Sequence, residues 1–333
     1  MKLTQVISLC DIYNIGDMVG ETQEVTGGFV HRLWRLHTTH GSYAIKQLNP
    51  AIMQYPNIYE TYRTSERIAA AMYAVGIPAV VALEGNDNDT LHIIDDDAFQ
   101  VYRWIDGTTL SSQTVDPERA RLIGNTLARM HALNQSFPKL IAPDWEPFSD
   151  DEWDMITFQA ADRGLPWAQR VRNALPRIAE WSQWEAQAGE TLEKTLVVSH
   201  RNLDQKNVLW QDAETFAILD WESAGLINPA MELVGAAFSW SGLMRGMPGE
   251  RTFHALLEGY VASGGIIREA GLTAIHGVIG NWLDWLHFNM LRSFTDLEQE
   301  RRVSESETLQ TLTLLYALAN NAETWASWVE KYR

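Results

Sequence analysis

The chain has 333 residues, 46% of them hydrophobic and 21% charged, which is typical of an ordinary globular protein with room for two lobes or domains. Its formal net charge of −17 argues against nucleic acid or an anionic membrane as a partner; the charge either favours a cationic small molecule or serves solubility alone. The sequence has no apolar run of roughly 18 residues or more of the kind that crosses a membrane, and Asp11 comes too early for a secretory signal. The single cysteine, Cys10, excludes an internal disulfide and a cysteine-rich metal site and fits a reducing cytoplasm, where we expect it to be a buried small hydrophobe.

The first predicted strands follow a short lead-in. Residues 1–24 predict a helical or extended segment, and residues 25–36 alternate as a pair of strands entered through Gly27 and Gly28. Glycines at this point let backbone N–H groups approach the phosphates of a nucleotide, although the same pair is also an ordinary turn.

The third predicted strand covers residues 42–46. Because strand side chains alternate between two faces, Ala44 and Lys46 share one face, and Tyr43 and Ile45 share the other. Taken alone, the strand favours a lysine that reaches solvent.

A long helix is predicted over residues 57–75, with a stop signal at Gly76 and Pro78. The helix carries two acids, Glu60 and Glu66, as candidate partners for a lysine. Exposure of Glu66 at the surface is the alternative.

The middle and the end of the chain predict mainly helices. Residues 91–104 predict two strands around an acidic turn, and residues 117–133 predict a helix in which His131 is a core or capping residue. The segment 143–154 mixes acids with aromatic residues, and it is either a solvated linker or a wall of a small-molecule site. Residues 298–307 predict a charged, solvated turn before a closing helix.

The most informative stretch lies between residues 197 and 222. An apolar run leads into the polar loop Ser-His-Arg-Asn-Leu-Asp-Gln-Lys-Asn, and a second and third apolar run form a hairpin that ends in Asp-Trp-Glu. This hairpin places Asn207 and Asp220 at the ends of neighbouring strands. An amide oxygen and a carboxylate held in this way suit Mg²⁺, which keeps waters and substrate phosphates as its other ligands.

His-x-Asp-x4-Asn followed by a strand that ends in Asp is the pattern of the kinase-like phosphotransferases, and the loop and Ile-Leu-Asp-Trp-Glu resemble the aminoglycoside phosphotransferase and choline kinase family most. The resemblance implies that His200 anchors the loop and that Asn207 and Asp220 hold Mg²⁺. It also assigns the catalytic base to position 202, where this chain has Asn202.

Asn202 departs from the pattern, because a neutral amide hydrogen-bonds an incoming hydroxyl without accepting its proton. Asp204 is a poor substitute, since it lies three residues before Asn207 where the motif requires five. Either the chain is a natural variant with weak or no transfer activity, or Asn202 is an engineered replacement of Asp. Because the other motif positions are intact, we favour the engineered replacement.

The resemblance also assigns nucleotide contacts in the first third of the chain. It implies that Ala44 lies beside the adenine, that Lys46 binds phosphates and that Glu66, rather than Glu60, positions Lys46. Residues 100–107 resemble the hinge that pairs with the adenine through its backbone. The candidate nucleotide-binding residues are Gly27, Gly28, Ala44, Lys46, Glu66, Val101, Tyr102, Arg103 and Trp104.

The acceptor site has the least specific signal in the sequence. Asn281, Asp284 and Trp285 lie one helical turn apart, where they form an acceptor-binding stripe or merely pack. Asp204 and Glu222 complete the candidate substrate residues, with Glu222 either near a second Mg²⁺ or facing solvent. We expect Glu232, after the metal loop, to be a buried acid that ties that loop to the catalytic segment.

The resemblance implies a two-lobe, protein-kinase-like α+β fold, with a nucleotide-binding lobe over 1–105 and a catalytic, acceptor-binding lobe over 106–333. It further implies a cytoplasmic, monomeric or dimeric O-phosphotransferase that uses ATP or GTP with Mg²⁺. The acidic balance favours an aminoglycoside-type antibiotic as acceptor, hence a role in antibiotic resistance. The alternatives are a choline or amino-alcohol, macrolide or sugar kinase, and a non-catalytic nucleotide-binding pseudokinase.

Overall fold

The computed structural model describes residues 1–25, 30–111, 115–133 and 135–333. The chain divides into two compact units: unit 1 consists of Met1–Thr109 with Lys206–Gly225, and unit 2 of Leu110–Gln205 with Leu226–Arg333. The functional lobes predicted over 1–105 and 106–333 remain a prediction, and the compact units differ from them in joining residues 206–225 to the N-terminal part.

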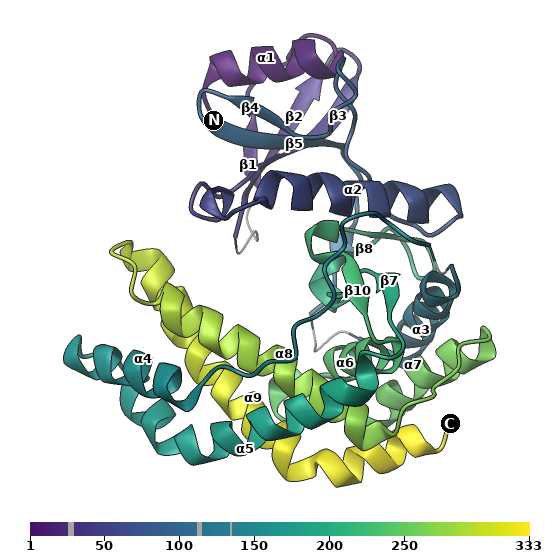
Figure 1. Cartoon of the computed structure of the whole chain (residues 1–333). Helices are drawn as coiled ribbons and strands as arrows, with labels where there is room; N and C mark the ends of the chain where they lie inside the picture. Colours follow the sequence, from purple (N-terminus) through teal and green to yellow (C-terminus); the bar gives the residue numbers. More distant parts are fainter. Residues whose placement is uncertain (26–29, 112–114, 134) are drawn as a thin grey trace. The chain divides into compact units, whose positions relative to one another are not determined.

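Unit 1 is built on a five-stranded antiparallel sheet of order β1-β2-β3-β5-β4 (Figure 1). Its strands are β1 (Gln23–Val25), β2 (Arg32–Thr38), β3 (Gly41–Gln47), β4 (His92–Ile94) and β5 (Asp97–Arg103). The predicted strands are confirmed, and the turn between β4 and β5 places Asp95 and Asp96 at φ of 50° and 68°. Acidic residues tolerate this left-handed conformation better than most side chains do.

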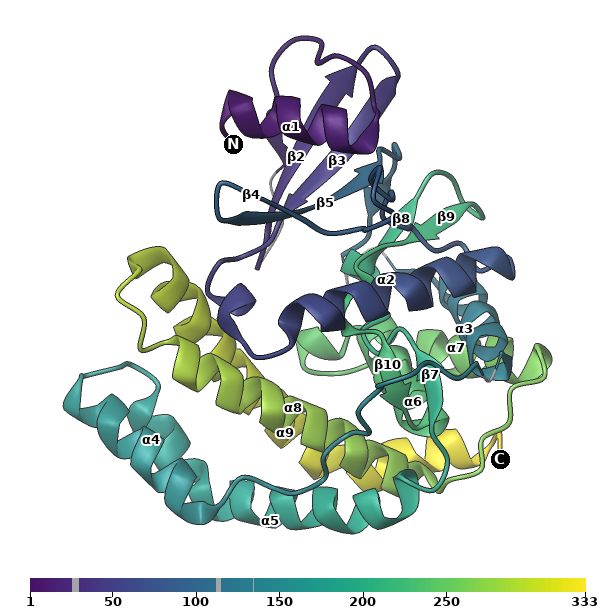
Figure 2. The ribbon, with the colours of Figure 1, turned by 45° about the horizontal axis from the view of Figure 1, so that its top comes forward.

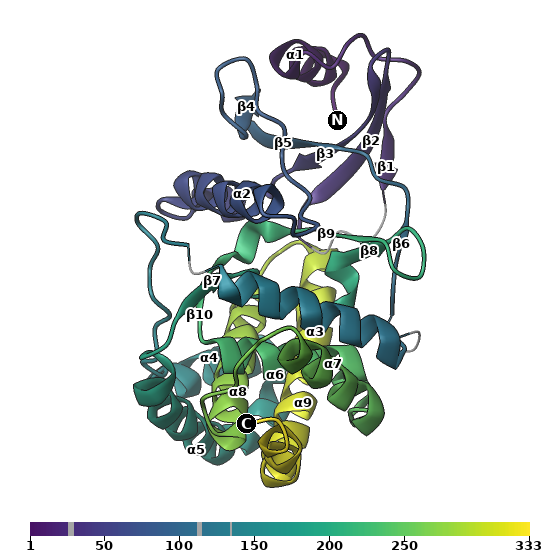
Figure 3. The same cartoon turned by 90° about the vertical axis from the view of Figure 1, so that its right-hand side faces the viewer.

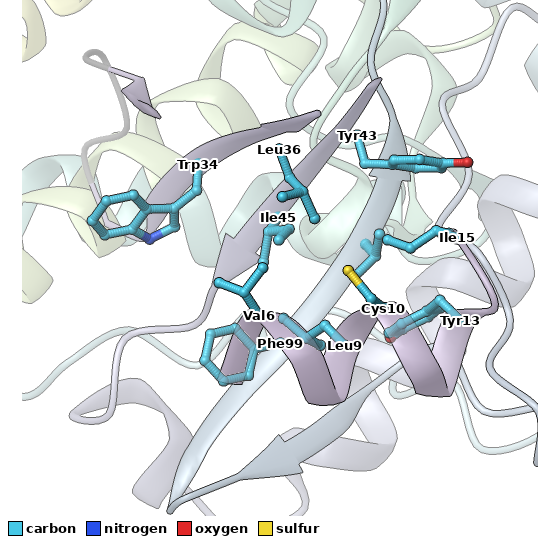
Figure 4. Close-up of a cluster of buried hydrophobic side chains, with 11 residues drawn as sticks. Val6, Leu9, Cys10, Tyr13, Ile15, Trp34, Leu36, Tyr43, Ile45 and Phe99 are labelled. Atoms are coloured by element: carbon cyan, nitrogen blue, oxygen red, sulfur yellow. The ribbon is translucent and has the colours of Figure 1, made fainter. Parts of the chain in front are cut away.

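Helix α1 (Leu3–Tyr13) covers one face of this sheet with an apolar stripe. Figure 4 shows the buried cluster that results: Val6, Leu9, Cys10, Tyr13 and Ile15 meet Trp34, Leu36, Tyr43, Ile45 and Phe99. Val101 of β5 belongs to the same cluster. The alternation predicted for β3 is therefore confirmed, since Tyr43 and Ile45 point into this cluster and Lys46 lies on the opposite face. Cys10 is buried, as predicted.

Helix α2 (Ile58–Ala74), preceded by the short η1 (Ile52–Gln54), lies on the other side of unit 1. It ends as predicted, because Gly76 has a φ of 81°, which a side chain would strain. Gln100 and Tyr102, which alternate on β5 with residues of the α1 cluster, hydrogen-bond to Glu66 of α2. The face of the sheet that carries Lys46 is thus the face that meets α2.

A smaller three-stranded sheet completes unit 1, in the order β6 (Thr108–Thr109), β8 (Val208–Trp210) and β9 (Phe216–Ile218). The predicted hairpin is confirmed by the pairing of Val208 with Ile218. Ile218 joins the hairpin to unit 1, because its N–H donates to the Pro78 carbonyl at 2.7 Å and its carbonyl accepts the Val80 N–H at 2.9 Å. The short turns η2 (Gln205–Asn207) and η3 (Trp221–Ser223) flank the hairpin.

Unit 2 is mainly helical (Figure 2, Figure 3). Its elements are α3 (Pro117–Ala132), α4 (Asp150–Asp162), α5 (Ala168–Leu192), β7 (Val197–Ser199), β10 (Gly225–Ile227), α6 (Pro229–Ser241), η4 (Leu243–Arg245), α7 (Glu250–Ala262), α8 (Gly271–Arg292) and α9 (Glu298–Glu330). Helix α8 packs against both α5 and α9. Within the described residues, every helix is too short or too polar to cross a membrane.

Two glycines set the close approach of α3 and α7, which run side by side in Figure 3. A Cβ added at Gly124 would lie 2.9 Å from the carbonyl carbon of Leu256, and one added at Gly259 would lie 2.9 Å from that of Arg121. Only residues without a side chain allow the two backbones to pack at this distance.

The predicted turn over residues 298–307 is wrong, because these residues form the first turns of α9. Glu300 pairs with Arg292 of α8 at 2.9 Å. Ser304 and Thr308 are buried, and their hydroxyls donate to carbonyls four residues earlier. Polar residues of this composition suggest a solvated turn until their tertiary partners are known.

Candidate active site

Lys46 is the centre of a charged cluster in unit 1. Its Nζ lies 2.5 Å from Oδ1 of Asp220 and 2.6 Å from Oε2 of Glu222. Strand β3 presents the lysine, and the segment after β9 presents both acids. Asp220 itself has a left-handed backbone with φ and ψ of 60°, which is uncommon for a residue with a side chain and turns the chain sharply after the strand.

The charges in this cluster stabilise one another. Burial alone would lower the pKa of Lys46, but Asp220 and Glu222 outweigh it and raise that pKa above its ordinary value. Burial likewise opposes ionisation of Glu222, yet Lys46 and His31 hold the pKa of Glu222 well below its usual range. The lysine and the glutamate are therefore both charged at neutral pH.

His31 and Tyr62 hold Glu222 in place. Nδ1 of His31 accepts the backbone N–H of Asn49 at 2.9 Å, which places the ring proton on Nε2. That nitrogen lies 3.0 Å from Oε2 of Glu222 and 2.8 Å from the hydroxyl of Tyr62. The Tyr62 hydroxyl also hydrogen-bonds to Glu222. Glu222 is therefore a carboxylate held against Lys46 rather than one that faces solvent, and its role as a ligand of a second metal stays a prediction.

The predicted pairing of Lys46 with Glu66 is wrong in this structure. Glu66 is only 5% exposed, so its surface alternative is also excluded. Its carboxylate accepts hydrogen bonds from the Tyr102 hydroxyl at 2.6 Å and the Ala82 N–H at 2.9 Å. Burial raises the pKa of Glu66, and these two bonds and the charge of Lys46 oppose the rise. The lysine has closer acids in Asp220 and Glu222.

The predicted metal ligands lie at the same end of the hairpin. Asn207 precedes β8 and is buried, and its carbonyl accepts the N–H of Leu219, the residue before Asp220, at 2.8 Å. In the described residues, no group of three or more His, Cys, Asp or Glu side chains is arranged to hold a metal. The Mg²⁺ site predicted here needs only one amide and one carboxylate, because phosphates and waters supply the remaining ligands, and this donor set fits Mg²⁺.

The catalytic-loop residues lie in unit 2. His200 is fully buried, and its Nδ1 accepts the N–H of Asn202 at 3.3 Å. The carbonyl of Asn202 accepts the N–H of Asp204 at 3.0 Å. Asn202 and Asp204 are both half-buried. A buried imidazole that shapes the turn after it is what the resemblance implied for His200.

A buried chain of hydrogen bonds supports this loop. The Tyr260 hydroxyl lies 2.9 Å from Nδ1 of His131, and Nε2 of the same ring lies 2.8 Å from Oε2 of Glu232. The other oxygen, Oε1, accepts the N–H of Arg201 at 2.6 Å. Arg201 has a φ of 66°, so the bond to Glu232 holds the loop where its backbone is strained. The prediction that Glu232 ties down the loop is confirmed, as is the burial of His131.

The predicted hinge overlaps the end of β5. The Val101 carbonyl accepts the Leu83 N–H at 2.7 Å, and the Trp104 N–H donates to the Ser42 carbonyl at 2.9 Å. These two backbone groups are therefore already used within unit 1. Tyr102 and Arg103, which pair with Ala44 and Tyr43, remain predicted nucleotide contacts, and Gly27 and Gly28 lie outside the described residues.

Three of the predicted acceptor residues, Asn281, Asp284 and Trp285, lie on α8 of unit 2. Trp285 stacks on Phe288 at 5.4 Å between ring centroids and donates from Nε1 to Glu307 at 3.3 Å, so it packs between helices. Asn281 and Asp284 reach solvent. Asp284 shares its surroundings with Glu185 of α5, a buried acid that the sequence did not single out.

Sequence reasoning also missed His31 and Tyr62. Neither belongs to a motif, and only the folding of unit 1 brings His31, just before β2, and Tyr62 of α2 to Glu222. Glu185 is likewise one acid among many on an amphipathic helix.

Three comparisons bear on the family. The model of the phosphotransferase enzyme family matches residues 21–265, well over half of the chain. No curated protein matches in a comparison of sequences. Among solved structures, spectinomycin phosphotransferase in complex with ADP and spectinomycin matches with a TM-score of 0.71 at 15% identity, over 96% of this chain and 99% of that one.

Two further structures have the same fold. Choline kinase from Cryptosporidium parvum matches with a TM-score of 0.62 at 11% identity, over 98% of this chain and 99% of that one. Macrolide 2′-phosphotransferase from Brachybacterium faecium matches with a TM-score of 0.55 at 17% identity, over 92% of this chain and 97% of that one. These structures confirm the predicted α+β, kinase-like fold, and on the evidence of the family match the chain belongs to the phosphotransferase enzyme family.

Proposed function

We propose that the protein is a small-molecule O-phosphotransferase framework, which directs the γ-phosphate of a nucleotide to a hydroxyl group of an acceptor. The observation that carries this proposal is the contact of Lys46 with Asp220 at 2.5 Å, beside the buried Asn207. A lysine, an acid and an amide at one place supply the positive charge and the oxygen ligands that bind phosphates and their metal.

In this proposal Lys46 binds nucleotide phosphates, and Asn207 and Asp220 hold Mg²⁺. The metal, when bound, neutralises charge on the phosphates. Lys46 pairs with the carboxylate of Asp220, which the metal requires as a ligand. Binding of the nucleotide therefore replaces the contact between Lys46 and Asp220 by contacts between Lys46 and phosphate oxygens. Glu222, held by His31 and Tyr62, keeps the lysine near its position during this exchange.

The nucleotide we propose is ATP rather than GTP. Two structures of spectinomycin phosphotransferase that share the fold contain ADP and AMP. Ala44, Tyr102 and Arg103 are the proposed neighbours of the adenine, and Gly27 and Gly28 the proposed neighbours of the phosphates.

Asn202 occupies the position of the base. Its amide aims the acceptor hydroxyl by a hydrogen bond, and His200 shapes the turn on which it sits. Because an amide does not accept the hydroxyl proton, we propose that transfer is slow, whether Asn202 is natural or an engineered replacement of Asp. The same residue supports the second candidate function, a non-catalytic nucleotide-binding protein.

For the acceptor we propose an aminoglycoside-type antibiotic first, with a choline-like amino alcohol next. The net charge of −17 and the acidic face near Asp284 support a cationic acceptor. A macrolide or a sugar needs an apolar or hydroxyl-binding pocket instead. We further propose that the enzyme works in the cytoplasm, as a monomer or dimer, in antibiotic resistance.

The test is nucleotide-dependent phosphorylation by the N202D variant of spectinomycin, kanamycin, choline and erythromycin. We expect N202D to raise the rate for one acceptor by about 10²–10⁴-fold, the usual contribution of a general base. The K46M/N202D variant should lose that gain. If N202D binds Mg·ATP and transfers phosphate to none of these acceptors, the non-catalytic function replaces the enzymatic one.

A further inference from the structure

Arg35 is a cation on the face of the larger sheet that carries Lys46. In the pairing of β2 with β3, Arg35 lies opposite Ala44, and Leu33 lies opposite Lys46. Because side chains alternate along a strand, Arg35 and Ala44 point away from the α1 cluster, as Lys46 does. The guanidinium of Arg35 therefore belongs to the same face as the proposed nucleotide contacts Ala44 and Lys46.

Trp104 reaches this face from the other side of β3. Its backbone N–H donates to the Ser42 carbonyl at 2.9 Å, so Trp104 extends the pairing of β5 with β3 by one position. Alternation places its ring on the same face as Tyr102, which pairs with Ala44. Strands β2 and β5 flank β3, so the side chains of Arg35 and Trp104 meet across β3, where Ser42 and Ala44 are short.

The two side chains form a cation–π pair. The guanidinium carbon of Arg35 lies 4.4 Å from the centroid of the Trp104 ring, which is within the range of favourable stacking. Asp106 supports the pair, because its Oδ1 accepts the Nε1–H of Trp104 at 2.8 Å and lies 3.7 Å from Nη2 of Arg35. An indole and a carboxylate thus orient a planar cation on the open side of Ala44.

The guanidinium of Arg35 has room for a further partner. A guanidinium has two faces, and in the part of the chain that the structure describes Trp104 supplies the one ring that stacks on it. Nε of Arg35 is buried and has no hydrogen-bond partner within the described ranges, and the 3.7 Å contact with Asp106 is too long for a hydrogen bond. The side chain is 29% exposed, so a ligand can reach it. A planar cation of this kind suits the flat face of a nucleobase.

The position of Arg35 relative to Lys46 matches the layout of a nucleotide. Ala44 and Lys46 are two residues apart on β3, which separates them by about 7 Å along the strand. The sugar and the first phosphate of a nucleotide span a gap of this order. With the terminal phosphates at Lys46 and the base at Ala44, the base lies beside Arg35, the cross-strand neighbour of Ala44.

We propose that Arg35 binds the base of the nucleotide, with its guanidinium stacked between the indole of Trp104 and the purine ring. This inference deepens the proposed function and rests on it, because the phosphates at Lys46 set the position of the base. It assigns to Arg35 the selection of an aromatic base over a bare polyphosphate.

The test compares Mg²⁺·ATP with Mg²⁺·tripolyphosphate, which has the same three phosphates and no base, by isothermal titration calorimetry. We expect the unchanged chain to bind ATP more tightly than tripolyphosphate. R35M should weaken the binding of ATP by about three- to thirtyfold, the range of a cation–π contact, and leave the affinity for tripolyphosphate unchanged. R35K keeps the charge and loses the plane, so it should recover only part of the lost affinity for ATP.

The matched control is R32M. Arg32 lies on the same strand, and its guanidinium carbon lies 4.8 Å from the centroid of the Trp34 ring, but Trp34 belongs to the α1 cluster on the opposite face. R32M should therefore leave both affinities unchanged. K46M should weaken the binding of both ligands, because it acts on the phosphates that they share.

The inference is overturned if R35M binds Mg²⁺·ATP as tightly as the unchanged chain does or more tightly. It is also overturned if R35M weakens ATP and tripolyphosphate alike, since Arg35 would then act on the phosphates or on the folding of the sheet. In both cases a loss of both ligands in K46M still supports the proposed function. Failure of the unchanged chain to bind either ligand contradicts the proposed function itself, and the inference with it.

Discussion

Lys46 and Asp220 stand 174 positions apart in the chain, yet their charged groups meet at 2.5 Å. The contact joins the third strand of the larger sheet to the turn after the hairpin, and it fixes both groups before any ligand arrives. In phosphotransferases the lysine and the acid act on the phosphates and the metal respectively. Each of the two groups therefore pairs with the other in place of the ligand that we propose it binds.

Replacing Lys46 by Met should lower the stability of the protein. Asp220 and Glu222 would lose their shared cation, and Glu222 would remain largely buried beside His31. We expect a loss of about 1–3 kcal/mol in the free energy of unfolding, below the range for fully buried pairs because Asp220 is partly exposed. Urea denaturation measures it, with K194M at an exposed lysine as the control. Equal stability of K46M and K194M would show that the cluster is not stabilising.

Stability should also depend on pH through Glu185. Its pKa is about 8 in the folded protein against 4.5 for the ordinary group, so the folded state binds more protons between these values. The free energy of unfolding should therefore fall as pH rises from about 5 to 8, by up to about 1.4 kcal/mol for each unit of pKa difference. In E185Q this decline should flatten, whereas E190Q, at an exposed glutamate on the same helix, should behave like the unchanged chain. An identical slope in all three proteins would contradict the raised pKa.

Glu232 should control the order of the catalytic loop. In E232A, the N–H of Arg201 loses its acceptor and His131 loses its carboxylate partner. We expect a loss of about 3 kcal/mol in stability, together with a marked gain in hydrogen exchange at the Arg201 amide. Mass-spectrometric exchange of peptides covering 199–204 measures this, with E190A as the reference. Unchanged protection at Arg201 would mean that the loop is ordered by other contacts.

The sequence predicts those features of the protein that depend on residues close together in the chain. The hairpin at Asn207 and the alternation around Lys46 follow from apolar patterns a few residues long, and both are confirmed. The polar loop at His200 carries a motif dense enough to indicate the family.

Partners chosen across the fold could not be predicted in the same way. Glu66 and Glu222 are both glutamates, and the sequence does not show which of them pairs with Lys46. The packing of α2 brings Glu66 to Tyr102, whereas Glu222 pairs with Lys46. The burial of Glu185 depends likewise on a distant residue, Gly280 of α8, against which its carboxyl group lies. The start of α9 was missed because its polar residues are buried by helices that are distant in sequence.

The most direct test of the central claim is the binding of Mn²⁺·ATP, followed by the electron paramagnetic resonance signal of free Mn²⁺. Asn202 suppresses turnover in our proposal, so the complex should last long enough to be titrated. D220N should weaken Mn²⁺·ATP binding by at least about tenfold, the effect of about 1.4 kcal/mol. D212N, at an exposed acid in the turn of the same hairpin, should leave binding unchanged. Equal affinity in D220N and the unchanged chain, or no binding by either, would contradict the assignment of Asp220 and Lys46 to the metal and the phosphates.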